Sequence, residues 1–145
     1  MSLFTSLSVS ASGMSAQRTR AELLVENIAN AETTRTPEGG PYRRKDAVFE
    51  SEIVGSPFAS VLEGELSAVS TGVRVTQVVV DTREPERKYL PGHPDADAEG
   101  YVAMPRMNPA EEMVDLMSAT RSYQANVAAI SAVKDMIQRS IDLMR

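Results

Sequence analysis

The chain has 145 residues, enough for one domain, and a formal net charge of −5 from 15 basic and 20 acidic side chains. This negative balance gives no general attraction to nucleic acid or to anionic lipid. Cysteine is absent and histidine occurs once, which excludes a disulfide framework, a thiolate nucleophile, a cysteine-ligated metal and a multi-histidine metal site.

The N-terminal segment, residues 2–30, carries apolar side chains mostly three, four or seven positions apart, which predicts an amphipathic helix. Its first half is rich in serine and threonine and contains Gly13. These residues have weak helix propensity, so we expect the isolated helix to fray. Turn-forming residues end the pattern after Asn30. The side chains expected on its packing face are Leu7, Met14, Leu24 and Ile28.

The middle region, residues 31–107, is expected to be rich in short strands, because seven of the eight prolines and seven of the eight glycines fall between the two predicted helices. Val73–Val80 is the clearest strand, since β-branched residues dominate it. Shorter candidates are Tyr42–Phe49, Lys88–Leu90 and Tyr101–Met104. Residues 51–70, rich in Ser, Ala and Glu without a clear period, predict a variable loop.

A C-terminal helix is predicted from Pro109 onward, with Asn108 as its cap and Glu111 completing a capping-box variant. Two series of seven-residue spacing follow. The first is Met113, Thr120, Val127, Lys134 and Ile141, and the second is Leu116, Tyr123, Ile130, Ile137 and Met144. A heptad repeat of this length predicts a left-handed coiled coil with a partner helix.

The length of this C-terminal helix indicates that it protrudes. Residues 109–145 would extend about 55 Å, whereas a compact globule of this chain length is about 40 Å across. The helix therefore needs a partner, supplied by residues 2–30 and by neighbouring subunits. The predicted fold class is α+β, with residues 1–30 and 108–145 forming one coiled-coil unit beside the β-rich middle region.

Three local patterns have a chemical interpretation and a simpler one. Asp95–Gly100 resembles the first half of a calcium loop, but Arg106 stands where its twelfth-position acid belongs, which favours a solvated acidic loop. Arg43–Lys45 has the charge to bind phosphate, yet a subunit contact or strand edge is favoured. His93 has no nucleophile motif beside it, which favours a turn position over a general base.

Short motifs along nearly the whole chain carry a family resemblance. They are Asn27-Ile28-Ala29-Asn30-Ala31, Gly40-Pro41-Tyr42-Arg43-Arg44-Lys45, Pro91-Gly92-His93-Pro94, Gly100-Tyr101-Val102-Ala103-Met104-Pro105, Glu112-Met113-Val114-Asp115-Leu116-Met117 and Ser122-Tyr123-Gln124-Ala125-Asn126-Val127. The chain resembles the proximal rod proteins of the flagellar basal body, within the flagellar axial superfamily of rod and hook proteins. It departs from the family pattern at Arg106-Met107, where an asparagine and a β-branched residue are expected.

The resemblance implies a structural role for named positions. The residues that carry the family motifs are Asn27, Asn30, Pro41, Tyr42, Tyr101, Pro105, Asn108, Pro109, Glu112 and Asn126. The side chains expected to form the assembly seam are Leu7, Met14, Leu24, Ile28, Met113, Leu116, Tyr123, Val127, Ile130, Ile137 and Ile141. No cofactor, metal, nucleic acid or small-molecule substrate is implied.

The resemblance also implies a location. Composition alone, without a signal peptide or an apolar run of membrane-spanning length, indicates a cytoplasmic protein. The family instead implies export through the flagellar type III apparatus without cleavage, and polymerisation in the periplasm with other copies and neighbouring rod proteins. Its terminal helices would form the inner layer of a rod that transmits torque.

Three other functions stay open on the sequence. A soluble coiled-coil adaptor outside the flagellum would keep the helices, and another rod or hook protein would keep the motif at Asn27 and Asn30. A cell-wall hydrolase would need paired carboxylates in a cleft, whereas the acids here fall mostly on expected helix surfaces and in Asp95–Glu99. The resemblance favours a structural subunit that is not an enzyme.

Overall fold

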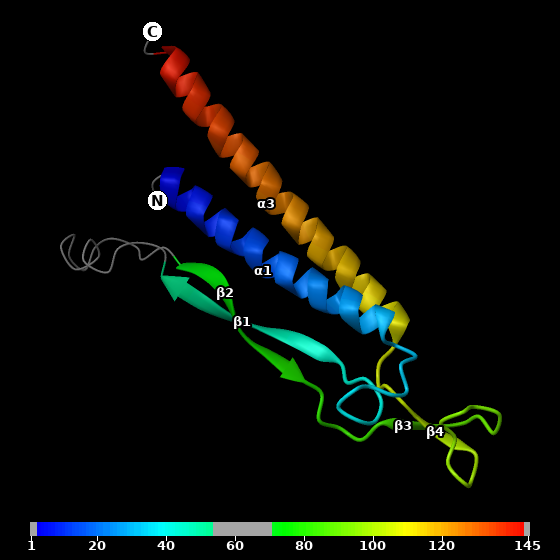
Figure 1. Ribbon diagram of the computed structural model, residues 1–145. Coiled ribbons are helices and arrows are strands. Elements are labelled where there is room, and N and C mark those ends of the chain that lie inside the picture. Colours follow the sequence, from blue (N-terminus) through cyan, green and yellow to red (C-terminus); the bar gives the residue numbers. More distant parts are fainter. Residues whose placement is uncertain (1–2, 54–70, 144–145) are drawn as a thin grey trace.

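In the described residues, 3–53 and 71–143, the chain forms a long helix, two antiparallel hairpins and a second long helix, in that order (Figure 1). Helix α1 spans Leu3–Ala29 and helix α3 spans Pro109–Leu143 in this computed structural model. The strands are β1 (Lys45–Ile53), β2 (Thr71–Val80), β3 (Glu86–Tyr89) and β4 (Tyr101–Met104). The architecture is α+β, as the sequence predicts.

The two helices lie side by side and run antiparallel, so the end of α1 meets the start of α3 (Figure 1). Gly13 lies at a close contact between the two helices. A Cβ atom built on Gly13 would lie 3.1 Å from Nδ2 and 3.3 Å from Oδ1 of Asn126. Glycine at this position therefore lets the polar Asn126 side chain occupy the space between the helices.

Helix α1 occupies the middle layer of the molecule. It packs against α3 on one side and against the β1–β2 hairpin on the other (Figure 1). The backbone N–H of Val73 donates a hydrogen bond to Oγ of Ser12, 3.1 Å away, and so fastens β2 to α1. Ser12, one of the serines that weaken the isolated helix, thus serves as a hydrogen-bonding group toward β2.

The β1–β2 hairpin is antiparallel and contains one bulge. Lys45 pairs with Val80 at its base and Ile53 with Thr71 at its far end, and the register shifts between Val48 and Phe49. The extra residue on β2 is Thr76, whose Oγ1 donates to the Val48 carbonyl oxygen at 3.3 Å. A bulge bends the hairpin and increases its twist.

The β3–β4 hairpin is short and lies beyond the joined ends of the helices (Figure 1). Tyr89 pairs with Tyr101, and their rings meet edge to face with centroids 5.3 Å apart. Gly100 has a positive φ of 86°, and a Cβ atom there would lie 2.9 Å from the Tyr89 ring. Only glycine fits this turn, which carries the Asp95–Glu99 loop.

Most sequence predictions of secondary structure are confirmed. Helix α3 begins at Pro109, with the Ala110 N–H donating to Oδ1 of Asn108 at 3.1 Å. All four predicted strands are present, although β1 begins later and β3 earlier than predicted. The variable loop predicted at residues 51–70 is wrong for 51–53, which continue β1, because alternating pairing with β2 extends to Ile53. Residues 54–70 and Met144 lie outside the described part of the chain.

The core between the layers is thin. Its buried apolar side chains include Ala16 and Leu24 on α1 and Ala119 and Val133 on α3, and two of these four are alanines. Within the described residues no helix is both long and apolar enough to cross a bilayer. Helix pairing therefore depends on close backbone approach and on polar contacts more than on large apolar side chains.

We predict that Gly13→Leu loosens the helix pair. A leucine side chain must displace Asn126 or separate α1 from α3, and overpacking of this kind lowers the free energy of unfolding by about 1 to 3 kcal/mol. Urea unfolding followed by circular dichroism at 222 nm measures the change. The matched control is Ala11→Leu, an exposed position on the same helix. An equal loss in both variants would contradict the close-approach role of Gly13.

Candidate functional site

The most completely hydrogen-bonded side chain in the buried interior is Asn27, near the end of α1 and 0% exposed. Its Nδ2 group donates to the Lys45 carbonyl oxygen at 2.9 Å and to Oε2 of Glu112 at 3.0 Å. Its Oδ1 atom accepts from the Lys45 backbone N–H and from the Tyr42 hydroxyl, each at 3.0 Å. The amide thus pairs with the backbone of β1 as a neighbouring strand would.

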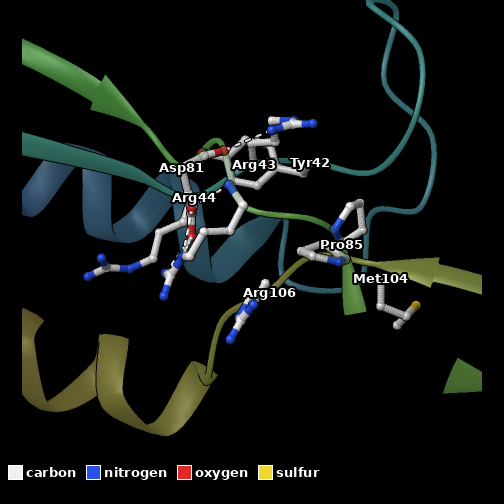
Figure 2. A pocket seen from close by; sticks show the side chains of 9 residues that line it. Tyr42, Arg43, Arg44, Asp81, Pro85, Met104 and Arg106 are labelled. Carbon is white, nitrogen blue, oxygen red and sulfur yellow. Dashed lines mark hydrogen bonds and ion pairs between the residues drawn. The ribbon is translucent and has the colours of Figure 1, made fainter. Parts of the chain in front are cut away.

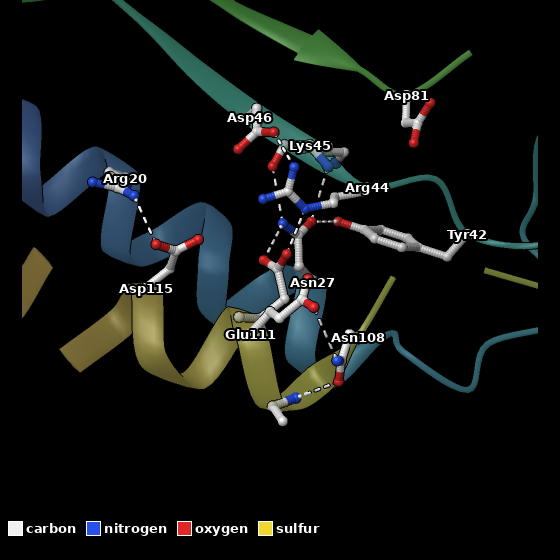
Figure 3. Close-up of polar contacts among 12 residues, drawn as sticks. Arg20, Asn27, Tyr42, Arg44, Lys45, Asp46, Asp81, Asn108, Glu111 and Asp115 are labelled. Atoms are coloured by element: carbon white, nitrogen blue, oxygen red, sulfur yellow. Dashed lines mark hydrogen bonds and ion pairs between the residues drawn. The ribbon is translucent and has the colours of Figure 1, made fainter. Parts of the chain in front are cut away.

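The side chain of Glu112, in the first turn of α3, is only 2% exposed and carries a charge into the interior. Arg44 neutralises it through a hydrogen-bonded ion pair, and Arg44 also pairs with Asp46 (Figure 3). Burial disfavours the charged form of Arg44, but the hydrogen bond and charge of Glu112 outweigh this effect and raise the pKa of Arg44. Loss of Arg44 would leave Glu112 as a buried, uncompensated charge.

We refer to Asn27, Tyr42, Arg44, Lys45 and Glu112 as the Asn27 cluster. It joins the end of α1, the start of β1 and the start of α3 at one point (Figure 3). The Lys45 ammonium pairs with Glu26 and lies 5.7 Å from the centroid of the Tyr42 ring. The cluster is therefore the junction through which three segments far apart in the sequence hold one another.

Two further polar contacts support the junction (Figure 3). Arg20 on α1 donates to Asp115 on α3 at 3.1 Å. Asn108 caps α3 and also donates through Nδ2 to Oε1 of Glu111 at 3.2 Å. Both contacts fix the position of the first turns of α3, because a cap and a cross-helix ion pair act on adjacent turns.

The family-motif residues divide between the cluster and other places. Asn27, Tyr42 and Glu112 meet in the cluster, and Asn108 and Pro109 begin α3. Asn30 bonds within its own helix end, Asn126 lies against Gly13, and Tyr101 donates its N–H to Asp97. Pro105 is buried and Pro41 is half-buried.

The expected assembly-seam residues separate into two groups. Leu24 is buried, and partly covered positions are Leu7, Met14, Ile28, Leu116, Ile130 and Ile137. Exposed positions are Met113, Tyr123, Val127 and Ile141. The first heptad series on α3 is exposed in the single chain, so its role in an assembly seam stays a prediction. The series turned inward is Glu112, Ala119, Asn126 and Val133.

Periodicity did not single out the inward series. Adjacent helix positions differ by about 100° around the axis, so the series that begins at Glu112 faces a different direction from the one that begins at Met113. Hydrophobic periodicity does not detect Glu112 or Asn126, because one is charged and the other is an amide. The exposed series at Met113, Val127 and Ile141 remains a prediction for contacts between subunits.

The basic triplet Arg43–Lys45 does not form one patch. Arg44 and Lys45 pair with carboxylates inside the chain, whereas Arg43 donates to the Asp81 carbonyl oxygen at 3.1 Å. Figure 2 shows a small pocket beside this point, lined by residues just before β1, just after β2, and from the end of β4 to the segment before α3. Side-chain and backbone hydrogen bonds from Arg83 lower the pKa of Asp81 there to about 2.

The remaining local motifs serve the β3–β4 turn. The His93 ring accepts the Asp95 N–H through Nδ1 at 3.2 Å, and Asp97 accepts the N–H groups of Glu99 and Tyr101. Among residues 3–53 and 71–143, no group of three or more acidic or histidine side chains is arranged to hold a metal ion. His93 occupies a turn, as its sequence context favours.

Sequence analysis did not identify the partners of Glu112 and Asn27. Arg44 appeared only as part of a basic triplet, and the Arg20–Asp115 pair spans 95 positions. The one available signal is the polarity of Asn27 and Glu112 on otherwise apolar helix faces, since a polar residue on a packing face requires a partner.

The family model described as the C-terminal part of the flagellar basal-body rod FlgEFG proteins matches residues 98–143. The flagellar basal-body rod protein FlgC of Bacillus subtilis strain 168 is 42% identical over 99% of both chains. FlgC of Borreliella burgdorferi is 39% identical over 100% of this chain and 99% of its own. FlgC of Salmonella typhimurium strain LT2 is 36% identical over 99% of this chain and 98% of its own.

We predict that Asn27→Asp destabilises the fold strongly at neutral pH. The substitution removes two donors and places a carboxylate against Glu112, so the free energy of unfolding should fall by about 3 kcal/mol or more. Urea unfolding measures it. The control is Asn30→Asp, whose side-chain bonds to Glu26 and Thr33 are local, with an expected loss below about 1 kcal/mol. An equal loss of unfolding free energy in both variants would contradict a special stabilising role for the Asn27 cluster.

Tyr42 gives the cluster a signature at high pH. Burial, with the carboxylates of Glu26 and Glu112 nearby, raises the pKa of Tyr42 to about 12. Because the folded state favours the protonated phenol, this stabilisation is complete below about pH 10 and is lost as the pH rises through about 12. Absorbance titration at 295 nm should show a late component that Tyr42→Phe removes. Its persistence in that variant would contradict the assignment.

Proposed function

Because the chain belongs to the FlgC family of flagellar basal-body rod proteins and is a structural subunit of the rod, we propose that its terminal helices assemble the rod by packing against those of neighbouring subunits. The inward series at Glu112, Ala119, Asn126 and Val133 has the seven-residue spacing of a coiled coil, which supports supercoiled packing of α1 with α3.

Uncovered apolar side chains on both helices are the observation that carries this proposal. On α1 the exposed large apolar residues are Leu3, Phe4 and Val25. On α3 they are Met113, Val114, Met117, Tyr123, Val127, Met136, Ile141 and Leu143. A helix of 35 residues with this much apolar surface in water gains stability when another helix covers it.

The two ends of the helix pair differ in how they are stabilised. The Asn27 cluster secures one end, whereas at the other end α3 continues past the described start of α1 (Figure 1). Leu143 is 88% exposed and Phe4 is 75% exposed at that far end. Neighbouring subunits would cover this open end, so helix order there increases on assembly.

We propose that residues 1–30 and 108–145 act as one assembly unit, with residues 31–107 as a second unit fastened to it by the Asn27 cluster and by β2. The partners are other copies of the chain and neighbouring rod proteins. The family also supports export through the flagellar type III apparatus without signal cleavage and assembly in the periplasm. A chain without cysteine needs no disulfide to fold there.

Two other functions receive less support. A coiled-coil adaptor outside the flagellum is not favoured, because the similarity to rod proteins extends over nearly the full length of the chain. A hydrolase is disfavoured because the buried carboxylate Glu112 is neutralised by Arg44 in a structural junction. The function proposed is mechanical, and we propose no enzymatic activity.

We predict that Met113→Glu combined with Val127→Glu abolishes swimming while leaving the isolated fold intact. These side chains are 56% and 45% exposed, so glutamate is tolerated in the monomer but would be unpaired and desolvated between subunits. Swimming in a host lacking the native gene, and circular dichroism of the purified chain, measure the two effects.

The control for this variant is Ser118→Glu, which adds one glutamate at an exposed position of α3 about 140° around the helix from Met113. It should swim normally. Normal swimming of the Met113→Glu and Val127→Glu variant would show that this face makes no subunit contact, and the helix-packing proposal would then fail.

A further inference from the structure

Four arginines from three segments surround the pocket of Figure 2. Arg43 and Arg44 lie just before β1, Arg83 follows β2, and Arg106 precedes α3. Such a concentration of guanidinium groups is unusual on a chain whose net charge is −5. Guanidinium groups favour carboxylate partners, because their planar donors match both oxygens.

Two of the four guanidinium groups are already neutralised. Arg44 pairs with Glu112 and Asp46, and Arg83 pairs with Asp81 at 2.5 Å. Arg43 reaches only a backbone carbonyl oxygen, and Arg106 forms no ion pair within the described ranges 3–53 and 71–143. Both side chains are exposed. Arg43 and Arg106 therefore remain available to carboxylates from outside the chain.

The Asp95–Glu99 loop supplies the complementary charge. Its carboxylates Asp95, Asp97 and Glu99 are exposed, and none forms an ion pair with a described residue. The loop is ordered by hydrogen bonds, since Asp97 Oδ1 accepts two backbone N–H groups and Thr34 donates to Asp95 at 2.8 Å. An ordered loop loses little conformational freedom when it binds.

We propose that Arg43 and Arg106 of one copy bind the Asp95–Glu99 loop of a second copy. The inference rests on the proposed function, because it assumes that copies of the chain contact one another in the rod. Negatively charged copies repel at long range, so a specific contact needs local complementarity of this kind. Two different surfaces meet in such a contact, and it can therefore repeat along a filament.

Charge exchange tests the contact. One variant carries Arg43→Glu and Arg106→Glu, and the other carries Asp95→Lys and Glu99→Lys. Asp97 is kept because it accepts two backbone N–H groups of the loop, whereas Asp95→Lys removes only the single bond from Thr34. Each variant alone should lose swimming and should be depleted from isolated basal bodies. The chain carrying all four substitutions should swim and should be present in isolated basal bodies again, since the complementary charges are restored with opposite signs. Circular dichroism should show the same helix content in all three.

A cross-link provides a second measurement, because the chain has no cysteine of its own. Arg106→Cys with Glu99→Cys should yield disulfide-linked multimers in oxidised basal bodies. The pair Arg106→Cys with Glu38→Cys, in which Glu38 is an exposed acid outside the loop, should not. Equal cross-linking of both pairs, or of neither, would contradict the contact.

The swimming results separate this inference from the proposed function. If both charge variants swim normally while the Met113→Glu and Val127→Glu variant does not, the arginine contact is wrong and the helix-packing proposal stands. If the arginine variant fails and the fourfold exchange does not restore swimming, the arginines bind an acidic segment of a different protein, and the second-copy contact is wrong.

Discussion

The hydrogen bonding of one buried amide, Asn27, is the interaction on which the rest of the structure depends. It binds the backbone of β1, the carboxylate of Glu112 on α3 and the hydroxyl of Tyr42, and it uses its full donor and acceptor capacity. A buried amide left partly unbonded would destabilise the fold. Its partners must therefore arrive together, which couples the placement of β1 to that of both helices.

This coupling explains why a thin apolar core suffices. Small residues such as Ala16 and Ala119 allow the helices to approach closely, but they provide little buried area. Polar contacts at the junction compensate at one end of the pair, and the opposite end keeps its apolar side chains exposed. The same division separates two tasks, because the junction stabilises the subunit while the exposed side chains remain available for contacts between subunits.

Periodicity and capping chemistry predicted both helices and the start of α3 at Pro109, and β-branched runs predicted the strands. The series of α3 that faces inward was not predicted, because Glu112 and Asn126 belong to it and carry no hydrophobic signal. The Asn27 cluster was not predicted as a unit, since its members lie up to 85 positions apart and only the tertiary fold brings them together. Family motifs singled out Asn27, Tyr42 and Glu112, but could not show that the three touch.

The geometry of the Asn27 cluster also determines how the subunit responds to force. In a turning rod, shear would tend to slide α1 along α3, in the direction of their long axes. The Asn27–Glu112 hydrogen bond joins the two helices directly. The other three bonds of Asn27 hold α1 to Tyr42 and Lys45, and their neighbour Arg44 pairs with Glu112, so sliding must break both the direct link and the link through Arg44. The junction would therefore resist such sliding at one end of the helix pair, whereas the far end, where Phe4 and Leu143 are exposed, has less to hold it.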